Sequence, residues 1–370
     1  MAKQLRCGYT TGACAAAGVK AALLYEAGAA WQEIELTALD GTLLHIPVKA
    51  VVRTDQGIQA EVVKFSGDDP DITDGVSVFT EIQHLTGVPS TIVFRAGQGI
   101  GTVTKPGLSV SVGEPSINPG PRALIRSAVR EVLGTDEVPI AVTISIPAGV
   151  ELARKTLNPI LGVEGGISII GTTGVLRPMS EEGFKNSLVP QIDVAKAAGY
   201  SDLIFVPGKI GERIATQWGL PKAAMVQTSN FIGFMLEAAA DRDAGSVLLF
   251  GHIGKLSKVA AGIFYTHNRI ADARLETMAA YAASAGLPQV EVSRLLAANT
   301  TEDALTVLSA AGLRQCVCQT LAERASIRAE RYLFGKLKVG TVMVTLTGEL
   351  LGMDETAREI GERYGWALPQ

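Results

Sequence analysis

The chain has 370 residues, 47% of them hydrophobic and 19% charged, and a formal net charge of −4. This length suggests two domains, each with its own hydrophobic core. The acidic balance gives no reason to expect nucleic-acid binding, which relies on Lys and Arg to neutralise phosphates. The uncharged stretch at residues 223–236 includes polar side chains and is shorter than the about 20 apolar residues that a bilayer span needs. Because the N-terminus also offers no signal peptide, we expect a cytoplasmic protein without a membrane segment.

The four cysteines, Cys7, Cys14, Cys316 and Cys318, form two close pairs along the chain. Neither pair has metal-ligand spacing with a neighbouring histidine. This pattern favours reduced thiols that act as small apolar side chains. We therefore expect no metal bound by the protein itself.

Residues 1–160 predict an α+β domain. Period-two alternation of apolar and polar residues is typical of strands with one buried face. We expect these strands at residues 33–39, 43–52, 58–65, 76–83, 91–94, 108–112 and 138–146. Two helices are predicted at residues 13–26 and 121–133, the second of which starts with a proline suited to a first turn. The sheet is expected to be mostly antiparallel or mixed.

Residues 161–370 predict a Rossmann-like α/β domain with a helical C-terminal part. Short strands alternate with helices, which favours a parallel sheet with right-handed crossovers. The expected strands cover residues 167–170, 203–206, 224–227 and 247–250, and the expected helices cover 181–198 and 231–240. After residue 272 the chain is expected to be mostly helical to about residue 332, followed by a strand at 339–346 and a helix at 355–364.

Residues 165–174, GGISIIGTTG, are the most informative segment. An apolar strand that ends in Gly-Thr-Thr-Gly leaves backbone N–H groups free at its carboxyl end. Open α/β sheets bind nucleotides and other small molecules at this edge. Gly, Ser, Thr, Asn or His also follows the other expected strands of this domain, so we expect a ligand crevice there.

Two loops near the N-terminus are candidate sites. In GYTTG at 8–12, Thr10 or Thr11 can cap the following helix, and the free N–H groups at that helix end suit an anion. The alternative is a plain cap on a tightly packed helix. The loop at 66–75 carries Asp68, Asp69 and two further aspartates, which suit a cation or a cationic group but lack the spacing of a calcium loop. A solvated turn is the alternative.

Two further loops are rich in glycine or proline. The segment at 97–107 resembles a phosphate loop, but a proline follows Lys105 and a strand is expected instead of a helix, so it is no dinucleotide fingerprint. Lys105 can still meet a ligand carboxylate. The segment at 113–122 has three prolines, which predict a stiff loop that fixes the positions of Glu114, Asn118 and Arg122.

The densest group of polar residues lies between 252 and 276. His252 ends the last clear strand and precedes a helix. His267 and Asp272 follow and lie five residues apart in the sequence. A ladder of surface salt bridges explains Arg274 and Glu276 equally well. It does not explain why two of the four histidines lie near the expected crevice.

These segments resemble the CbiD-type cobalt-precorrin-5B C(1)-methyltransferases of anaerobic cobalamin biosynthesis. The resemblance covers nearly the whole chain and rests on several motifs in fixed order. They are GYTTGACAAA at 8–17, GDDPDIT at 67–73, GIGTVTKPGL at 99–108, GEPSINPGPR at 113–122, GGISIIGTTG at 165–174, TSNFIGFML at 228–236 and HIGKLSKVAAGIFYTHNRIADARLE at 252–276.

The resemblance implies methyl transfer from S-adenosylmethionine to carbon 1 of a ring-contracted tetrapyrrole, which gives cobalt-precorrin-6A. Cobalt is then part of the substrate. Carboxylates of the tetrapyrrole call for counter-charges, and a base can assist by removing a proton. We expect the base to be His252, His267 or Asp272. The expected substrate-binding residues are Thr10, Thr11, Asp68, Asp69, Lys105, Glu114, Asn118, Arg122, Lys255 and Arg274.

The methyl donor is expected in the crevice of the second domain, by the rule that open α/β sheets bind ligands where the strand order reverses. The expected donor-binding residues are Gly171, Thr172, Thr173, Gly174, Gly208, Ser229 and Asn230. A transient hand-off to neighbouring cobalamin-pathway enzymes and a homo-oligomer are both compatible with this function.

Alternatives remain open at this point. A non-catalytic carrier of the tetrapyrrole would use the same cationic loops without needing S-adenosylmethionine. A nucleotide-dependent kinase or synthetase acting on a small anionic substrate would also suit the glycine-rich turns, although the chain has no GxxxxGK[ST] loop. A nicotinamide-dependent reductase is disfavoured, because no strand is followed by both GxGxxG and the acidic residue that such enzymes use.

Overall fold

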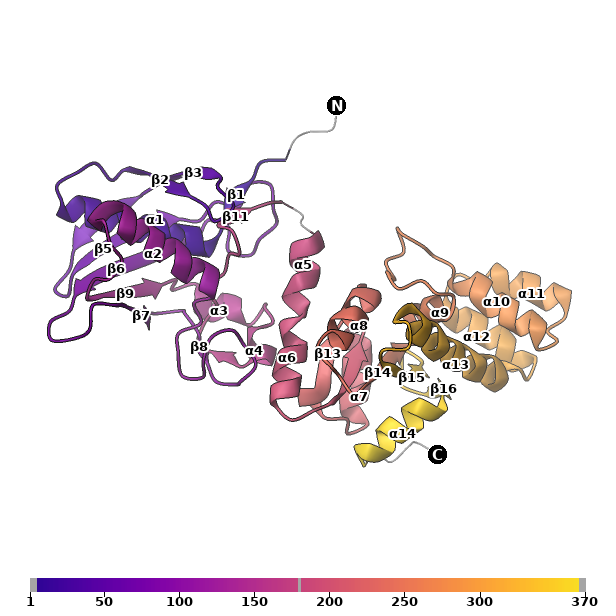
Figure 1. The fold of residues 1–370 in the computed structure, drawn as a ribbon. Helices are drawn as coiled ribbons and strands as arrows, with labels where there is room; N and C mark the ends of the chain where they lie inside the picture. The colour runs from indigo at the N-terminus through magenta and orange to yellow at the C-terminus, as the bar shows by residue number, and fades with distance from the viewer. Residues whose placement is uncertain (1–4, 179–180, 366–370) are drawn as a thin grey trace. The chain divides into compact units, whose positions relative to one another are not determined.

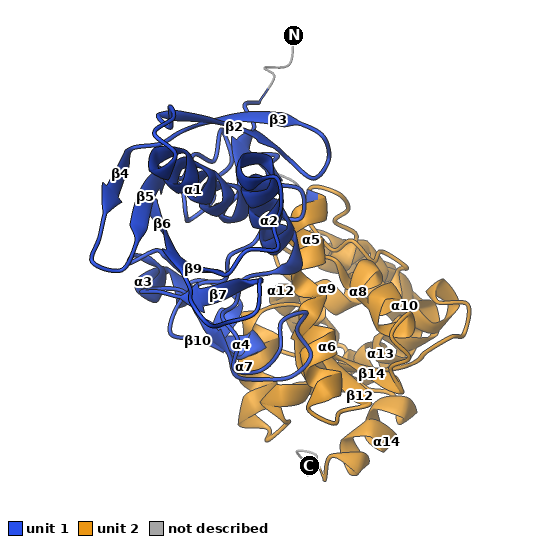
Figure 2. Cartoon of the chain, turned by 60° about the vertical axis from the view of Figure 1, so that its left-hand side comes forward, with its two compact units in different colours: residues 1–181 blue, residues 182–370 orange. Residues whose placement is uncertain are grey.

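The computed structural model describes residues 5–178 and 181–365. The chain divides into two compact units, unit 1 from Met1 to Glu181 and unit 2 from Glu182 to Gln370 (Figure 2). The division lies later than the boundary expected at residue 160. Residues 163–176 pair with strands and loops of unit 1, which is why unit 1 extends further along the chain.

Unit 1 is built on a mixed five-stranded sheet in the order β4-β5-β6-β9-β7. All neighbouring strands are antiparallel except β7 and β9, which are parallel. A separate antiparallel hairpin joins β2 and β3. The strands are β2 (Glu33–Thr37), β3 (Leu43–Pro47), β4 (Ala50–Arg53), β5 (Ile58–Val63), β6 (Ser77–His84), β7 (Ile92–Ala96) and β9 (Ile140–Ser145). The expected α+β domain with a mixed sheet is confirmed.

Two helices, α1 (Thr11–Glu26) and α2 (Pro119–Leu133), pack against each other beside this sheet (Figure 1). Helix α1 is rich in alanine and buried over most of its surface. Its small side chains allow close approach to the sheet, since a Cβ on Gly18 would lie 2.9 Å from Thr80 Oγ1. Helix α2 buries one face only and ends at Gly134, which has φ 77°.

The glycine-rich segment 165–174 belongs to unit 1, so the expected strand at 167–170 in the second domain is wrong. Ile167 and Ile169 form isolated bridges with Ile100 and Ile117, and both are buried in the unit 1 core. Apolar character alone cannot tell a strand of one sheet from a buried connection in another. The flanking short ladders pair β1 (Gly8–Tyr9) with β11 (Val175–Leu176), and β8 (Thr102–Val103) with β10 (Val163–Glu164).

The strand expected at 108–112 is also wrong. These residues form turns and bends, and Val110 instead packs with Val103 and Val163 in a small satellite core. Two short helices, α3 (Gly149–Ala153) and α4 (Asn158–Leu161), follow β9.

Unit 2 is an open five-stranded sheet in the order β13-β12-β14-β15-β16. The first four strands are parallel, and β16 is antiparallel to β15. The strands are β12 (Asp202–Val206), β13 (Met225–Gln227), β14 (Ser246–His252), β15 (Lys338–Val344) and β16 (Leu350–Met353). The α/β character and the mainly parallel sheet agree with the sequence, whereas β16 was not expected.

Helices connect these strands and cover the sheet (Figure 1). One helix was expected over 181–198, but Pro190 begins a new helix there, so α5 and α6 are separate. The helices are α5 (Glu181–Leu188), α6 (Pro190–Ala197), α7 (Lys209–Gln217), α8 (Ile232–Ala240), α9 (Ile253–Ala260), α10 (Arg274–Ser284), α11 (Gln289–Leu296), α12 (Thr301–Ala310), α13 (Arg314–Tyr332) and α14 (Glu355–Arg363). Within the described ranges, no helix is long and apolar enough to cross a membrane.

Candidate active site

The connections of the unit 2 sheet reverse direction around β12. From β12 the chain moves to β13 on one side and then to β14 on the other. Ligands of open α/β sheets bind at the carboxyl ends of the strands at such a switch point. Here the carboxyl ends are Pro207-Gly208 after β12, residues 228–230 after β13, and His252 at the end of β14. We call this place the switch-point edge.

Glycines bring the first turn of α7 close to the end of β14. A Cβ on Gly211 would lie 2.9 Å from the carbonyl oxygen of Phe250, and one on Gly251 would lie 3.1 Å from Pro207 Cδ. Gly208 is the N-cap of α7 and offers no side chain to its first N–H groups. The positive end of this helix is therefore open toward the switch-point edge.

Lys255 joins the ends of β12 and β13. Its Nζ donates to the carbonyl oxygen of Pro207 at 2.6 Å and to that of Ser229 at 3.3 Å. Lys255 was expected to bind the tetrapyrrole, but in the structure its amine contacts the backbone of Ser229, one of the expected donor-binding residues. Burial, with a smaller contribution from the charge of Lys258, lowers the pKa of the Lys255 amine.

The loop after β13 has an unusual backbone. Ser229 has φ 53°, a left-handed conformation that few residues other than glycine adopt. The backbone of Asn230 accepts from the N–H of Thr266 at 2.9 Å. The hydroxyl of Thr228 is buried and has no hydrogen-bond partner in the described part of the chain. Gly208, Ser229 and Asn230 thus all lie at the switch-point edge.

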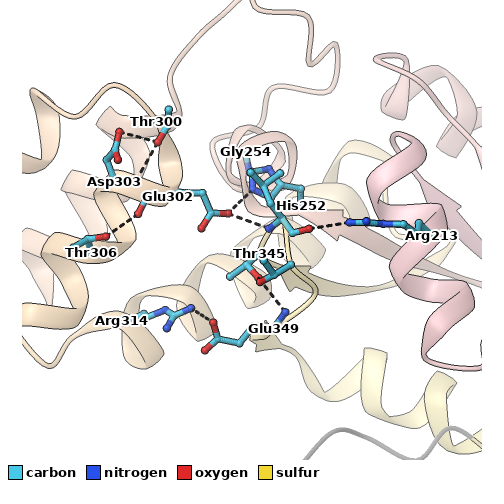
Figure 3. A network of polar contacts seen from close by, with 12 residues as sticks. Arg213, His252, Gly254, Thr300, Glu302, Asp303, Thr306, Arg314, Thr345 and Glu349 are labelled. Atoms are coloured by element: carbon cyan, nitrogen blue, oxygen red, sulfur yellow. Dashed lines mark hydrogen bonds and ion pairs between the residues drawn. The ribbon is translucent and has the colours of Figure 1, made fainter.

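His252 is held in one tautomer by two partners (Figure 3). Its Nδ1 accepts the N–H of Gly254 at 3.1 Å and thereby caps α9, so Nδ1 carries no proton. Its Nε2 lies 3.0 Å from Glu302 Oε1 and donates to it. Because both ring nitrogens are occupied, His252 is not poised to take a proton from a substrate.

Glu302 was missed by the sequence analysis. Its Oε1 also accepts the N–H of Leu346 at 3.1 Å, and Arg213 donates to the carbonyl of Leu346 at 3.0 Å (Figure 3). Glu302 therefore connects α12 with the end of β14 and with the turn after β15. Acidic residues are common in the first turn of a helix, and Glu302 occupies that position in a helix capped by Thr300. Its sequence neighbours therefore do not indicate its contact with His252.

Of the other expected catalytic residues, neither is a free base. Asp272 accepts two hydrogen bonds from Arg274, at 2.6 and 2.9 Å, and these bonds lower its pKa. His267 Nδ1 accepts the N–H of Arg269 at 3.1 Å. Helix α10 begins only at Arg274, so Asp272 lies outside it. Arg274 is correspondingly paired within the protein and is not the free counter-charge that was expected.

The expected donor-binding glycines and threonines at 171–174 belong to unit 1, whereas Gly208, Ser229 and Asn230 belong to unit 2. Residues 171–174 pack against the GYTTG turn: the N–H of Gly12 donates to the carbonyl of Ile170 at 3.0 Å, and the N–H of Thr10 donates to that of Gly174 at 2.9 Å. A Cβ on Gly171 would lie 2.2 Å from Thr10 Oγ1. Close backbone packing accounts for these glycines, while Thr172 is exposed and Thr173 half-buried.

The side chains of Thr10 and Thr11 are used inside unit 1. Thr10 Oγ1 caps α1 through the N–H of Ala13, and Thr11 Oγ1 exchanges hydrogen bonds with the backbone of Ile170. The acidic loop is likewise occupied, because Asp68 binds the Arg6 guanidinium and backbone. Asp69 follows in the same loop, and its N–H donates to the carbonyl of Ser66.

The two glycine- and proline-rich loops also show internal contacts. Arg122 donates to Glu114 at 2.8 Å and to the carbonyl of Ile117 at 2.8 Å, so its charge is paired. Asn118 is the N-cap of α2, although its side chain makes no capping bond. Lys105 is exposed, and its Nζ lies 3.4 Å from the carbonyl oxygen of Ile160.

An open pocket of about 620 Å³ lies in unit 1 beside the GYTTG turn. Its wall combines aromatic rings with cationic groups, which suits a flat anionic molecule. Burial raises the pKa of Tyr9 to about 12, so its hydroxyl stays protonated and donates to the carbonyl of Val63. The lining residues are Tyr9, His45, Pro47, Val48, Lys49, Val63, Lys64, Phe65, Asp74 and Gly75.

Lys64 is the most buried cation of this pocket, with 2% of its surface exposed. Its Nζ donates to Ser66 Oγ at 2.7 Å and to Asp71 Oδ2 at 3.1 Å. Burial alone would raise the pKa of Asp71, but hydrogen bonds from Thr73 and the nearby Lys64 ammonium lower it overall. Among the residues that the structure describes, no group of three or more His, Cys, Asp or Glu side chains is placed to hold a metal ion.

Comparison with known proteins identifies the family. The profile of CbiD matches residues 1–178, and that of the CbiD C-terminal domain matches residues 265–355. The cobalt-precorrin-5B C(1)-methyltransferase of Moorella thermoacetica is 49% identical over 372 residues, which cover 99% of this chain and all of that protein. The chain belongs to the CbiD family. The resemblance seen in the sequence motifs is thereby confirmed.

Other members of the CbiD family are similarly close. The proteins of the same name from Desulfitobacterium hafniense and Methanocaldococcus jannaschii are 45% and 44% identical, and they match 98% and 95% of this chain over 93% and 96% of their own lengths. A crystal structure of a cobalamin biosynthesis protein (CbiD) from Archaeoglobus fulgidus is 25% identical, with a TM-score of 0.38 over 72% of this chain and 83% of that one.

Proposed function

We propose that this protein methylates carbon 1 of cobalt-precorrin-5B, giving cobalt-precorrin-6A, with S-adenosylmethionine as the methyl donor. The observation that carries the proposal is the 49% identity, over essentially the full length of both chains, to a protein of that activity. The carrier and kinase alternatives lose their support, because full-length relatives with 37–49% identity are named as methyltransferases.

The donor binds at the switch-point edge of unit 2. This proposal keeps Gly208, Ser229 and Asn230 from the expected set and leaves out residues 171–174, whose backbone contacts the GYTTG turn of unit 1. Support comes from the open N-terminus of α7, the left-handed backbone at Ser229 and the lysine that joins the strand ends. These are the features with which α/β sheets hold polar groups of a nucleotide-like ligand.

The tetrapyrrole binds the open pocket of unit 1. Tyr9 and Phe65 offer aromatic surface with ring centroids 6.1 Å apart, while Lys49 and Lys64 line the wall as partners of Glu61 and Asp71. Replacing the half-exposed Phe65 with Ala removes ring stacking worth about 1 kcal/mol, or roughly fivefold in affinity for the tetrapyrrole. Phe334→Ala is the matched control, since Phe334 is 90% exposed. Equal affinities of both variants and wild type would place the substrate elsewhere.

Methyl transfer at this site depends mainly on positioning. A sulfonium methyl reacts by in-line attack, and holding both reactants in place contributes roughly 7–11 kcal/mol. His252 and Asp272 are engaged with Glu302 and Arg274, so we assign neither of them the role of base. Their part is to fix the start of α9 and the segment before α10.

The test is an anaerobic assay of the purified protein with cobalt-precorrin-5B and S-adenosylmethionine. We expect S-adenosylhomocysteine to form in equal amount to methylated tetrapyrrole, as followed by liquid chromatography and mass spectrometry. Tetrapyrrole binding without any donor consumption would favour the carrier function instead. Consumption of a nucleoside triphosphate would favour the kinase or synthetase.

A further inference from the structure

The Lys255 side chain carries a half-buried charge without an acidic partner. Its two hydrogen bonds go to neutral backbone carbonyls, those of Pro207 and Ser229. In the described part of the chain it forms no ion pair, whereas its neighbour Lys258 has Asp272 at 3.9 Å. A buried ammonium is costly unless an anion or several hydrogen bonds compensate it. An ammonium has three donors, so one remains for a ligand.

The start of α7 adds backbone N–H donors at the edge where Lys255 lies. The N-terminus of α7 points to the same edge and lacks a capping side chain. Lys209, the first residue of α7, is exposed and paired with Glu212. Gly208 leaves the space next to the amine open, because even a Cβ there would stay 4.0 Å from Nζ. An anionic group seated beside Gly208 would meet both the amine and the helix end.

We propose that Lys255 binds the carboxylate of the amino-acid part of the methyl donor, with the first N–H groups of α7 as further donors. This inference rests on the proposed function and specifies how the donor is oriented. The carboxylate accepts a charge-assisted hydrogen bond from Nζ. The carbonyl contacts with Pro207 and Ser229 fix the amine in place before the donor arrives.

A purely structural role predicts something different. If Lys255 only held the ends of β12 and β13 together, its replacement would disturb every ligand at this edge equally. Recognition of a carboxylate, in contrast, affects only ligands that carry one. Two probes separate these cases: S-adenosylhomocysteine, and methylthioadenosine, which keeps the nucleoside and the thioether but has no amino-acid part.

The experiment titrates wild type, Lys255→Gln and Lys255→Met with both probes by calorimetry, with and without the tetrapyrrole present. Gln keeps hydrogen-bond donors without the charge. We expect both variants to bind S-adenosylhomocysteine roughly 10- to 100-fold more weakly, the range for one hydrogen bond to a charged group. Affinity for methylthioadenosine should stay within about twofold of wild type.

Lys222→Gln is the matched control, because it removes an exposed charge of unit 2 that precedes β13 and lies outside the switch-point edge. It should bind both probes like wild type, and thermal unfolding should show that each variant is folded. Equal loss of both probes, or no loss of either, in the Lys255 variants overturns the inference and leaves the donor site intact. A wild-type protein that binds neither probe under either condition contradicts the proposed donor function as well.

Discussion

At the scale of single residues, the structure gives His252 a structural role in place of the expected catalytic one. His252 is one of the few titratable groups at the switch-point edge, which made it a natural candidate for a base. Its two nitrogens are nevertheless occupied, one by the N–H of Gly254 and one by Glu302. The sequence around His252 does not reveal Glu302 as a partner, because Glu302 lies 50 residues further along the chain, in α12.

Replacing His252 with Asn should therefore preserve activity. Asn is a good N-cap and keeps an acceptor for α9, whereas His252→Ala should lower the free energy of unfolding by about 1 kcal/mol. Methyl-transfer rates and denaturant melts of both variants check this. A drop in kcat of about 100-fold or more in the folded Asn variant would mean that His252 acts as a general base after all.

Asp71 should make the stability of unit 1 depend on pH. Its folded-state pKa is lowered relative to the unfolded chain, so ionised Asp71 stabilises the fold at neutral pH. That contribution is present above the unfolded pKa of about 4 and is lost as the pH falls through the lower folded value. Asp71→Asn should cost roughly 2 kcal/mol at pH 7, because it leaves the buried Lys64 without its carboxylate.

Urea melts at neutral and acidic pH measure this effect. The difference in stability between wild type and Asp71→Asn should shrink as the pH approaches 3. Asp55→Asn, at an exposed position of unit 1, serves as a comparison for a general change of charge. A difference between wild type and Asp71→Asn that stays constant with pH would contradict the assigned ion pair.

At the scale of elements, the GTTG turn at 171–174 is a packing motif of unit 1. Its backbone forms hydrogen bonds with the GYTTG turn. The close contact between the two turns explains why both are rich in glycine. Free N–H groups after an apolar strand suggested a ligand site. In the structure, the carbonyl groups of this turn are paired within unit 1: that of Thr173 accepts from the N–H of Leu39, and that of Gly174 accepts from the N–H of Thr10.

Gly171→Ala should destabilise the protein by about 1–3 kcal/mol, because the added Cβ would meet Thr10 and the backbone has φ 143°. Thr172→Ala changes an exposed side chain and should stay within about 0.5 kcal/mol of wild type. Chemical denaturation measures both values. We also expect Thr172→Ala to bind S-adenosylhomocysteine like wild type; a clear loss of affinity would return this turn to the donor site.

Local patterns predicted most elements of the fold. Helices α1, α2 and α8 and strands β12 and β14 lie within a few residues of their expected positions, because their periodicity and end signals are strong. The strand at 167–170 failed for another reason. A short apolar run has the same pattern in any core, and only long-range pairing with Ile100 and Ile117 decides where it lies.

Local patterns also predicted part of the candidate site. The rule for strand ends placed Gly208, Ser229 and Asn230 at one edge, and the parallel register of β12, β13 and β14 agrees with that placement. It could not assign Lys255, whose position depends on two carbonyls from separate strands. Partners of side chains follow from tertiary structure, which a single sequence does not display.

At the scale of the whole molecule, two units of similar size have different architectures. Unit 1 has a mixed sheet with packed glycine motifs and an open pocket, and unit 2 has a mainly parallel sheet with a switch point. Family membership extends over both. We propose one ligand for each unit, the tetrapyrrole for the pocket of unit 1 and the donor for the switch-point edge of unit 2.

The central claim is that carbon 1 of the tetrapyrrole receives the methyl group. The most direct measurement supplies S-adenosylmethionine with an isotope-labelled methyl carbon and locates the label in the product by NMR. We predict a single labelled methyl group bonded to carbon 1. Label at any other carbon, or an unlabelled tetrapyrrole recovered from folded protein with both substrates present, would contradict the account.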